Sequence, residues 1–226
     1  MNQTIHQVFW VFKNGQPLEE IPKYKDNVEA TQEFCKTNDI EYKLWGLKEC
    51  EKLVYQEFPE YIDLWKNFRY EIQRVDFIRY CILYQFGGLY IDCDIRPVKN
   101  LELVFKDKLF FVHWSNDEKK LPYNAVMGAH QGQELFLDIL KECERSYLEK
   151  SKMEIYDTWK GRFIFQTTGH HMLERVMKKQ KMNKNKYFHD CLYIDNPEKK
   201  GMSAIGEINK ALFLDSNASV WFENLI

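Results

Sequence analysis

The sequence predicts an α/β fold with a mostly parallel sheet, because segments typical of strands alternate with segments typical of helices along its 226 residues. Short runs rich in β-branched and aromatic residues indicate the strands. Longer runs with apolar residues three and four apart indicate the helices. The chain is 45% hydrophobic, so it can bury the core of one domain spanning residues 1–226, with a small helical annex on the sheet.

The predicted strands are short and apolar. Residues 5–12 read IHQVFWVF and precede NGQPLEEIP, a segment with turn-forming residues. Residues 40–46 alternate in polarity and end at a glycine, which predicts a second strand. Further strands are predicted over 89–92, 108–114 and 124–129, with late strand or loop material over 186–194 and 211–222.

Residues 71–86 give the clearest helix prediction, because Ile72, Val75 and Ile82 belong to one repeat of three and four. Gly87 stands where a C-terminal helix cap is expected. Other helices are predicted over 26–37, 47–68 (with breaks at Pro59 and Asn67), 132–150 and 169–180. The helical segment 47–68 and material after residue 130 would form the annex.

Composition and charge exclude several classes of protein. The net charge of −2 does not favour a nucleic-acid partner. The N-terminus lacks the features of a signal peptide, and no window approaches the roughly 20 apolar residues of a membrane span. We therefore expect a cytoplasmic protein without a transmembrane segment. The lysines of 178–186 and 198–200 are expected to be solvated, and peripheral contact with the inner face of an anionic membrane is the alternative.

Two carboxylates, Asp92 and Asp94, end the predicted strand 89–92 in the stretch GGLYIDCDIRP. Side chains two apart in a strand point the same way, so both can converge on one point. A hard divalent cation such as Mg²⁺ or Mn²⁺ takes such oxygen ligands and relieves their repulsion. The Asp-x-Asp pattern alone arises readily by chance, and its place after a glycine pair and a buried strand gives it weight. Another Mg²⁺-dependent nucleotide or phosphate enzyme, or a non-catalytic sugar-binding module, would also fit.

Asp76 and Arg79 lie three residues apart, on one face of the predicted helix 71–86. Their neighbours are apolar, and a buried charge is costly unless it is paired. A structural ion pair and a pair that holds sugar hydroxyls fit equally well on these grounds. Arg79 would also suit a phosphate.

The segment RVDFIRYCILYQFGGLYIDCDIRPVKNL, residues 74–101, closely resembles the signature of glycosyltransferase family 32, the sugar transferases with a DXD motif. More distantly it is similar to the glucosylating domain of large clostridial toxins. The family pattern is present in register at Asp76, Arg79, Gly87, Gly88, Tyr90, Asp92 and Asp94. The segments IHQVFW, YNAVMGA and SNASVWF resemble the family's opening, its central asparagine-containing strand and its C-terminal Ser-Trp element.

The resemblance implies a GT-A fold, which is a Rossmann-like sheet that binds a nucleotide-diphosphate sugar, UDP- or GDP-linked, and Mn²⁺ or Mg²⁺. It implies a hexosyl transfer with retention of configuration. Asp94 would bind the cation directly, and Asp92 would act through the ribose, the sugar or a metal-bound water. Asp76 and Arg79 would hold hydroxyls of the donor sugar, and Asn124 would reach the sugar or the reaction centre.

The remaining expectations concern the nucleotide and the acceptor. Phe9 or Trp10 would stack on the base, and Tyr90 would touch the sugar or pack. Ser219 and Trp221 would close over the diphosphate, and Asp215 or Asn217 would add a metal ligand. The expected acceptor is a glycan or glycolipid hydroxyl in cell-surface polysaccharide or lipooligosaccharide synthesis, with a protein acceptor as the alternative.

Overall fold

The computed structural model describes residues 1–12, 15–113, 121–189, 192–194 and 211–216. Six strands form the main sheet: β1 (Thr4–Val8), β2 (Glu41–Trp45), β3 (Gly88–Ile91), β5 (Leu109–His113), β6 (Pro122–Ala129) and β7 (Phe188–His189). A second, three-stranded sheet consists of β4 (Ile95–Pro97), β8 (Leu192–Ile194) and β9 (Phe213–Asp215). The sequence predicted the main sheet but not β4, which is too short to show a periodic pattern.

The main sheet has the strand order β2-β1-β3-β6-β5-β7. Strand β1 is parallel to β2 and β3, and β5 is parallel to β7. Strand β6 runs antiparallel to its neighbours β3 and β5. The predicted α/β class is confirmed, and the reversed β6 is the one described strand that breaks the parallel direction of this sheet.

The helices match the predicted pattern and add short elements to it. They are α1 (Pro22–Thr37), α2 (Leu47–Glu57), α3 (Ile62–Asn67), α4 (Glu71–Phe86), α5 (Glu102–Lys106), α6 (Glu134–Lys150), α7 (Ile155–Thr158), α8 (Lys160–Thr167), α9 (His170–Lys179) and α10 (Lys184–Tyr187). Helix α1 begins earlier than predicted because Pro22 occupies a first-turn position, where its missing N–H is not needed. The short helices α5, α7, α8 and α10 were not predicted.

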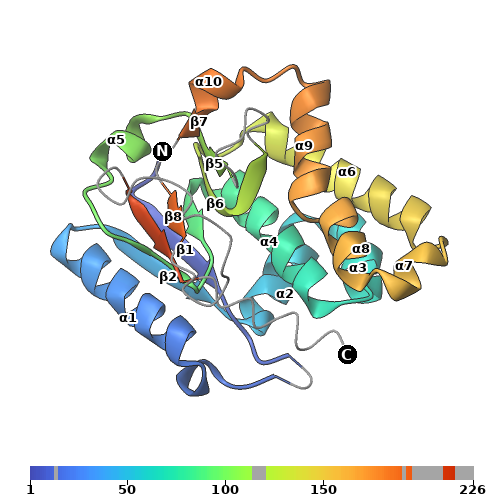
Figure 1. Ribbon diagram of the computed structural model, residues 1–226, viewed down its shortest axis with the longest axis horizontal. Helices are drawn as coiled ribbons and strands as arrows, with labels where there is room; N and C mark the ends of the chain where they lie inside the picture. Colours follow the sequence, from blue (N-terminus) through green and yellow to red (C-terminus); the bar gives the residue numbers. More distant parts are fainter. Residues whose placement is uncertain (13–14, 114–120, 190–191, 195–210, 217–226) are drawn as a thin grey trace.

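Helices lie on both faces of the main sheet, and alternate residues of each strand serve the two sides (Figure 1). Leu89 and Ile91 pack in the core that includes residues of α1 and α5. Tyr90 between them packs in the larger core with α2, α3, α4, α6, α8 and α9. Alternate residues of β3 therefore contribute to both cores, and the polar residues Asp92 and Asp94 follow the end of the strand.

The connections of β1 place a crevice at its carboxyl end. From β1 the chain crosses through α1 to β2 on one side, while β3 lies on the other side of β1. Open α/β sheets bind ligands where neighbouring connections diverge in this way. The segments that follow β1 and β3 both begin at this crevice.

The glycine pair before β3 is required by close packing. Gly88 has φ +84°, and a Cβ atom there would lie 2.7 Å from the carbonyl oxygen of Thr4. Gly87 has φ +68°, and its Cβ would lie 2.6 Å from the backbone nitrogen of Gln131. Because α4 must turn sharply into a central strand, only residues without a side chain fit at both positions.

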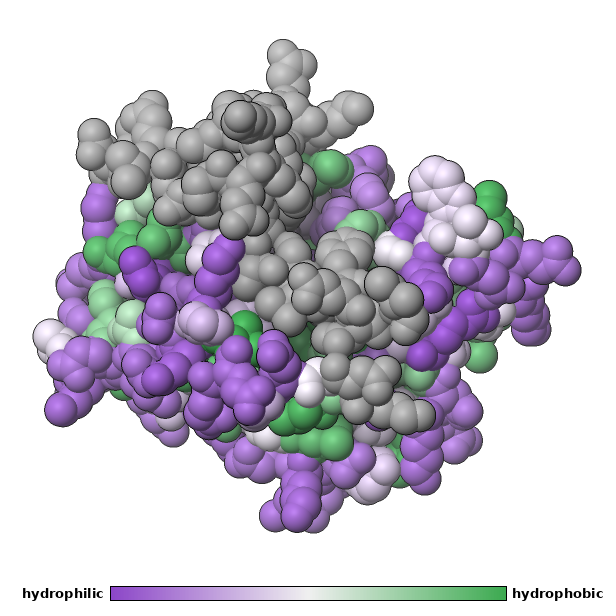
Figure 2. Space-filling view, turned by 60° about the horizontal axis from the view of Figure 1, so that its bottom comes forward, coloured by the Kyte–Doolittle hydropathy of each residue, from purple (hydrophilic) through white to green (hydrophobic). Residues whose placement is uncertain are grey.

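The described surface seen in Figure 2 is largely hydrophilic, with hydrophobic atoms in separate patches. This distribution agrees with the burial of most large apolar side chains in the two cores. Among the helices that the structure describes, none has the length and apolar character needed to cross a bilayer.

Candidate active site

A cavity of about 340 Å³ opens at the carboxyl ends of β1 and β3. Its walls come from segments far apart in the sequence: the residues after β1, those after β3, the start of β6, one face of α4 and the turn between α8 and α9. Apolar and aromatic side chains form much of the lining, and Asp76, Arg79, Asp92 and Asp94 are its charged members. The structure therefore brings the predicted acidic and basic residues to one concave site.

Arg79 on α4 is the centre of the polar cluster. Its guanidinium lies 3.1 Å from Asp76 Oδ1 and 3.1 Å from Asp92 Oδ1, and it donates to the backbone oxygen of Asn124 at 2.8 Å. The guanidinium also lies over the ring of Tyr90, 4.8 Å from its centroid. Arg79 is almost completely buried, so its charge is balanced by the two carboxylates and not by water.

Asp92 is held on two sides. The hydroxyl of Tyr90 donates to Asp92 Oδ1 at 2.6 Å, and Arg79 contacts the same carboxylate. Burial raises the pKa of Asp92, while Arg79 and the Tyr90 hydroxyl oppose that rise. Tyr90 is fully buried and supports Asp92 from behind the cavity wall. The position of the Asp92 carboxylate is therefore fixed by protein groups alone.

Asp76 links α4 to two other parts of the chain. Its Oδ1 accepts a hydrogen bond from Asn124 Nδ2 at 2.9 Å, and its Oδ2 accepts one from Thr168 Oγ1 at 2.9 Å. Burial raises the pKa of Asp76 to about 6, against the opposing effects of Arg79 and of these two hydrogen bonds. Near neutral pH the carboxyl is mostly ionised and paired with Arg79.

Asp94 lies two residues beyond Asp92, where the chain enters β4. Its backbone oxygen accepts hydrogen bonds from the backbone N–H and the hydroxyl of Ser216, both at 2.9 Å. Ser216 follows the buried Asp215, whose carboxylate accepts a bond from the Tyr123 hydroxyl at 3.0 Å. The second sheet thus fixes the backbone that carries Asp94 at the edge of the cavity.

The residues present fit a hard divalent cation. Asp92 and Asp94 are partly exposed, line the same cavity and offer carboxylate oxygens, which suit Mg²⁺ or Mn²⁺. Within the described parts of the chain, no group of three or more His, Cys, Asp or Glu side chains is placed to hold a metal. The protein would therefore supply a pair of ligands and leave coordination positions for water and phosphate, as is common for Mg²⁺.

The two aromatic residues after β1 both line the cavity. Phe9 is half-buried and meets Tyr24 of α1 edge-to-face, with ring centroids 6.0 Å apart. Trp10 is buried, and its indole N–H donates to Glu71 Oε2 at 2.8 Å. Phe9 is therefore the freer of the two to receive a planar base.

The turn between α8 and α9 is the part of the site that sequence reasoning missed. Thr168 contacts Asp76, and Gly169, His170 and His171 line the cavity. The sequence alone indicates a helix start at TTGHHML and leaves its two histidines open between a surface or capping role and a ligand or acid-base role. A threonine and two histidines beside a glycine were the available signal, but nothing in the sequence placed them next to α4.

The predicted contributions of Ser219 and Trp221, and of Asn217 as a further metal ligand, lie outside the described residues. Asp215, the other residue considered as a metal ligand, is fully buried against Tyr123.

Comparison with known proteins finds similarity to glycosyltransferases both in sequence and in structure. Residues 18–111 match the family model described as a glycosyltransferase sugar-binding region containing the DXD motif. The chain is 28% identical over 183 residues to mannosyl phosphorylinositol ceramide synthase CSH1 of Saccharomyces cerevisiae, covering 81% of this chain and 45% of that protein. It is 33% identical over 109 residues to mannosyl phosphorylinositol ceramide synthase SUR1 of the same yeast, covering 47% of this chain and 27% of that protein.

Among solved structures, the PaToxG glycosyltransferase is similar with a TM-score of 0.51 at 15% identity, covering 79% of this chain and 68% of that one. At this identity the similarity concerns the fold. The chain spans less than half the length of the two yeast relatives.

Proposed function

Because residues 18–111 match the model of the glycosyltransferase sugar-binding region that contains the DXD motif, we propose that this chain transfers a hexose from a nucleotide-diphosphate sugar to a hydroxyl acceptor. One observation carries the proposal. Asp76, Arg79, Asp92 and Asp94, the four charged positions of the family pattern, all line one cavity at the switch point of the sheet.

Asp94 would hold Mn²⁺ or Mg²⁺ together with Asp92. When bound, such a cation neutralises the negative charge that collects on a departing nucleoside diphosphate. Asp94 is the more direct ligand, because the Asp92 carboxylate already receives Arg79 and Tyr90.

Asp76 and Arg79 would bind hydroxyls of the donor sugar. Their mutual contact and their bonds to Asn124 and Thr168 fix both side chains before any substrate arrives. Such preorganised groups bind a ligand without first having to be ordered. Phe9 would stack on the base, beside Tyr24.

The transfer itself breaks the bond between the anomeric carbon and the diphosphate oxygen, whose electron pair stays on the diphosphate. The anomeric carbon forms a new bond to the acceptor oxygen. The acceptor's proton goes to the departing phosphate oxygen on the same face of the sugar, which retains the configuration. Exclusion of water from the cavity would favour the acceptor over hydrolysis.

The sugar donor to test first is GDP-mannose, because the yeast relatives are named mannosyl phosphorylinositol ceramide synthases. The acceptor class that their names suggest is the head group of a glycolipid. UDP-glucose and UDP-galactose complete a first panel of sugar donors.

Calorimetric titration with GDP and UDP, with and without Mn²⁺, tests the proposal. We expect metal-dependent binding of one nucleotide by the wild type and loss of the metal dependence in Asp94→Asn. Asp63→Asn is the matched control, since Asp63 is exposed on α3 away from the cavity. Binding of neither nucleotide, or unchanged metal dependence in Asp94→Asn, would contradict the assignment.

A further inference from the structure

Two adjacent threonines at the end of α8 attach that helix to α4, the helix that carries Asp76. Thr167 accepts a hydrogen bond from the side chain of Gln73 at 2.8 Å, and Thr168 donates one to Asp76 Oδ2 at 2.9 Å. Both threonines are fully buried. Of these four residues, Asp76 is the one that lines the cavity. The two contacts are therefore alike in burial and length, but only the contact of Thr168 ends on a residue proposed to bind the donor sugar.

The Asp76 carboxylate keeps one acceptor position that protein donors leave open. Its Oδ1 receives Arg79 at 3.1 Å and Asn124 Nδ2 at 2.9 Å, which together use both lone-pair directions of that oxygen. Among the hydrogen bonds between described residues, a single one reaches Oδ2, and it comes from Thr168. A sugar hydroxyl that donates to Asp76 would therefore do so at Oδ2, beside Thr168.

The hydroxyl of Thr168 has a single hydrogen, for which two acceptors compete. Oδ2 of Asp76 lies at 2.9 Å and the backbone oxygen of Ile164 at 3.4 Å. The closer and charged acceptor forms the stronger bond. Because this bond occupies one lone-pair direction of Oδ2, it also sets the direction that remains for a substrate.

A closed circuit of hydrogen bonds holds Thr168 against α4. The hydroxyl of Tyr80 donates to the backbone oxygen of Thr168 at 2.8 Å and accepts from Asn124 Nδ2 at 3.3 Å. Asn124 and Thr168 in turn both donate to Asp76. All four residues are buried, so water does not compete for these bonds.

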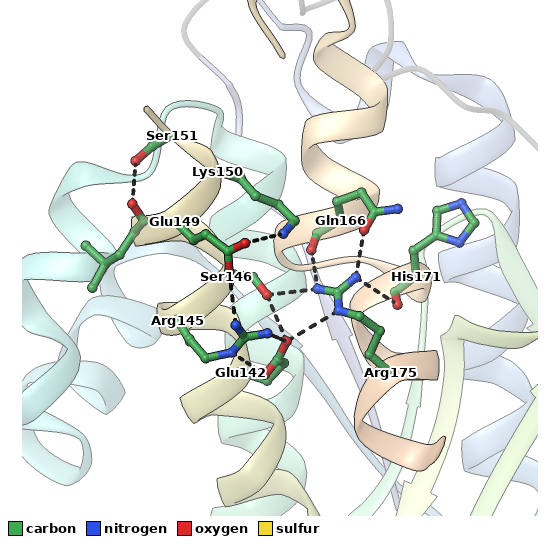
Figure 3. A network of polar contacts seen from close by, with 10 residues as sticks. Glu142, Arg145, Ser146, Glu149, Lys150, Ser151, Gln166, His171 and Arg175 are labelled. Atoms are coloured by element: carbon green, nitrogen blue, oxygen red, sulfur yellow. Dashed lines mark hydrogen bonds and ion pairs between the residues drawn. The ribbon is translucent and has the colours of Figure 1, made fainter. Parts of the chain in front are cut away.

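A second network, drawn in Figure 3, holds both ends of the turn between α8 and α9. Arg175 of α9 donates to the backbone oxygen of His171 at 3.2 Å and to both oxygens of Gln166, backbone and side chain, at 2.7 Å. Its other contacts are to Ser146 Oγ at 2.8 Å and Glu142 Oε1 at 3.4 Å, both on α6. The turn is therefore tied to a third helix and presents its side chains on a fixed backbone.

We propose that Thr168 is a positioning residue for the sugar transfer, which orients the Asp76 carboxylate so that Oδ2 presents one open acceptor position to the donor sugar. The proposal rests on the proposed function and deepens it, because it assigns part of the affinity for the sugar to a residue that does not touch the sugar. Burial raises the pKa of Asp76 to about 6, and the hydrogen bond from Thr168 opposes that rise. Thr168 thus also favours the ionised carboxylate, which accepts a hydroxyl.

The test compares the binding of a nucleotide sugar with the binding of its nucleotide alone. Wild type and variants are titrated calorimetrically in the presence of Mn²⁺ with GDP-mannose and GDP, and with UDP-glucose, UDP-galactose and UDP. The readout is the dissociation constant of the nucleotide sugar divided by that of the free nucleotide, for whichever pair the wild type binds. A residue that only supports the fold would change both constants together, whereas a residue that orients Asp76 should change their ratio.

Thr168→Val keeps the shape of the side chain but loses the hydroxyl, and it should raise this ratio about tenfold, the effect of losing one hydrogen bond to a charged group. The dissociation constant of the free nucleotide should stay within about twofold of the wild-type value. Thr168→Ala should show a similar loss, so the result does not depend on the fold tolerating valine. Thr168→Ser retains the hydroxyl and should keep the ratio within about threefold of the wild type.

Thr167→Val is the matched control, because Thr167 is equally buried and contacts Gln73, which does not line the cavity. This variant should lower the Tm but leave the ratio within about twofold of the wild type. In the Asp76→Ala background, Thr168→Val should change the ratio by less than about twofold, because its effect passes through the Asp76 carboxylate.

Three results would overturn the proposal: an unchanged ratio in both Thr168→Val and Thr168→Ala, an equal rise in Thr167→Val, or a further rise of about tenfold when Thr168→Val is added to Asp76→Ala. A wild type that binds neither nucleotide and none of the nucleotide sugars would instead overturn the sugar transfer itself. The two failures are therefore distinguishable.

Discussion

Replacing Arg79 by lysine keeps the positive charge on α4 but removes the fork that joins two carboxylates. In the wild type the guanidinium reaches Asp76 and Asp92, each at 3.1 Å, and also the backbone oxygen of Asn124 at 2.8 Å. A lysine side chain has a single ammonium nitrogen on a flexible stem and can form a close ion pair with one of the two carboxylates. The other loses its partner in a site that is nearly closed to water.

The expected cost follows from the contacts that are lost. One charge-assisted hydrogen bond and one bond to a backbone oxygen together contribute about 3 kcal/mol to the free energy of unfolding. For a domain of this size, that corresponds to a decrease in Tm of about 6–12 °C. Nucleotide-sugar affinity should fall as well, because Arg79 is proposed to hold a sugar hydroxyl.

Thermal and denaturant unfolding measure this cost, with Arg74→Lys as the control on the same helix. Arg74 donates to the backbone oxygen of Trp65 at 3.1 Å and is ion-paired with neither carboxylate of the cluster. We expect Arg74→Lys to cost about 1 kcal/mol or less. If Arg79→Lys is no more destabilising than Arg74→Lys, the guanidinium does not organise the cluster and our reasoning fails.

Three further predictions concern the backbone, the pH response and the metal. Gly88→Ala should lower the free energy of unfolding by about 3 kcal/mol or more, because its Cβ would lie 2.7 Å from the oxygen of Thr4. Gly132→Ala, with φ +74° but open space around it, should lower it by about 1 kcal/mol. Equal denaturant midpoints for the two variants would contradict this prediction. The pKa of Asp76 is about 6, above its ordinary value of 3.8, so the folded state should lose stability as the pH rises from 4 to 6 and this carboxyl ionises. Transfer should decline below about pH 6, because protonation of Asp76 removes its ion pair with Arg79. That acid limb should be absent from the residual activity of Asp76→Asn, and its persistence there would assign the titration to another group. Removal of divalent cations by EDTA should abolish nucleotide binding, and added Mn²⁺ should restore it. The far-UV circular dichroism should not change, because protein groups already position Asp92. Loss of secondary structure would show that the metal is also structural.

The part of the site between α4 and β4 could be predicted from the sequence because it is continuous. Asp76 and Arg79 share one helix face, and Asp92 and Asp94 follow one strand, so local periodicity was enough to orient each pair. The glycine pair marked the sharp turn that brings the helix end to the strand. The resemblance then supplied Asn124, which periodicity alone would have left as an ordinary strand residue.

The contacts of Thr168 and of the two histidines could not be predicted in this way. Thr168 lies 92 residues from Asp76 in the sequence, and their hydrogen bond depends on the packing of α8 and α9 against α4 and α6. Helix α8 is only eight residues long, and its apolar pattern is too brief to predict its position. The sequence left His170 and His171 open between a surface or capping role and a ligand or acid-base role, because only the packed helices create the cavity wall that both residues line.

The reversal of β6 makes its alignment with β3 a condition for activity. Residue Val126 pairs with Ile91, and this alignment sets Asn124 beside Asp76. Successive side chains of a strand point to opposite faces, so a slip by one residue would turn the Asn124 amide away from α4. Deleting a single codon inside β6 could therefore leave a well-formed sheet in an inert protein, and natural variants that gain or lose one residue there should be rare among active transferases.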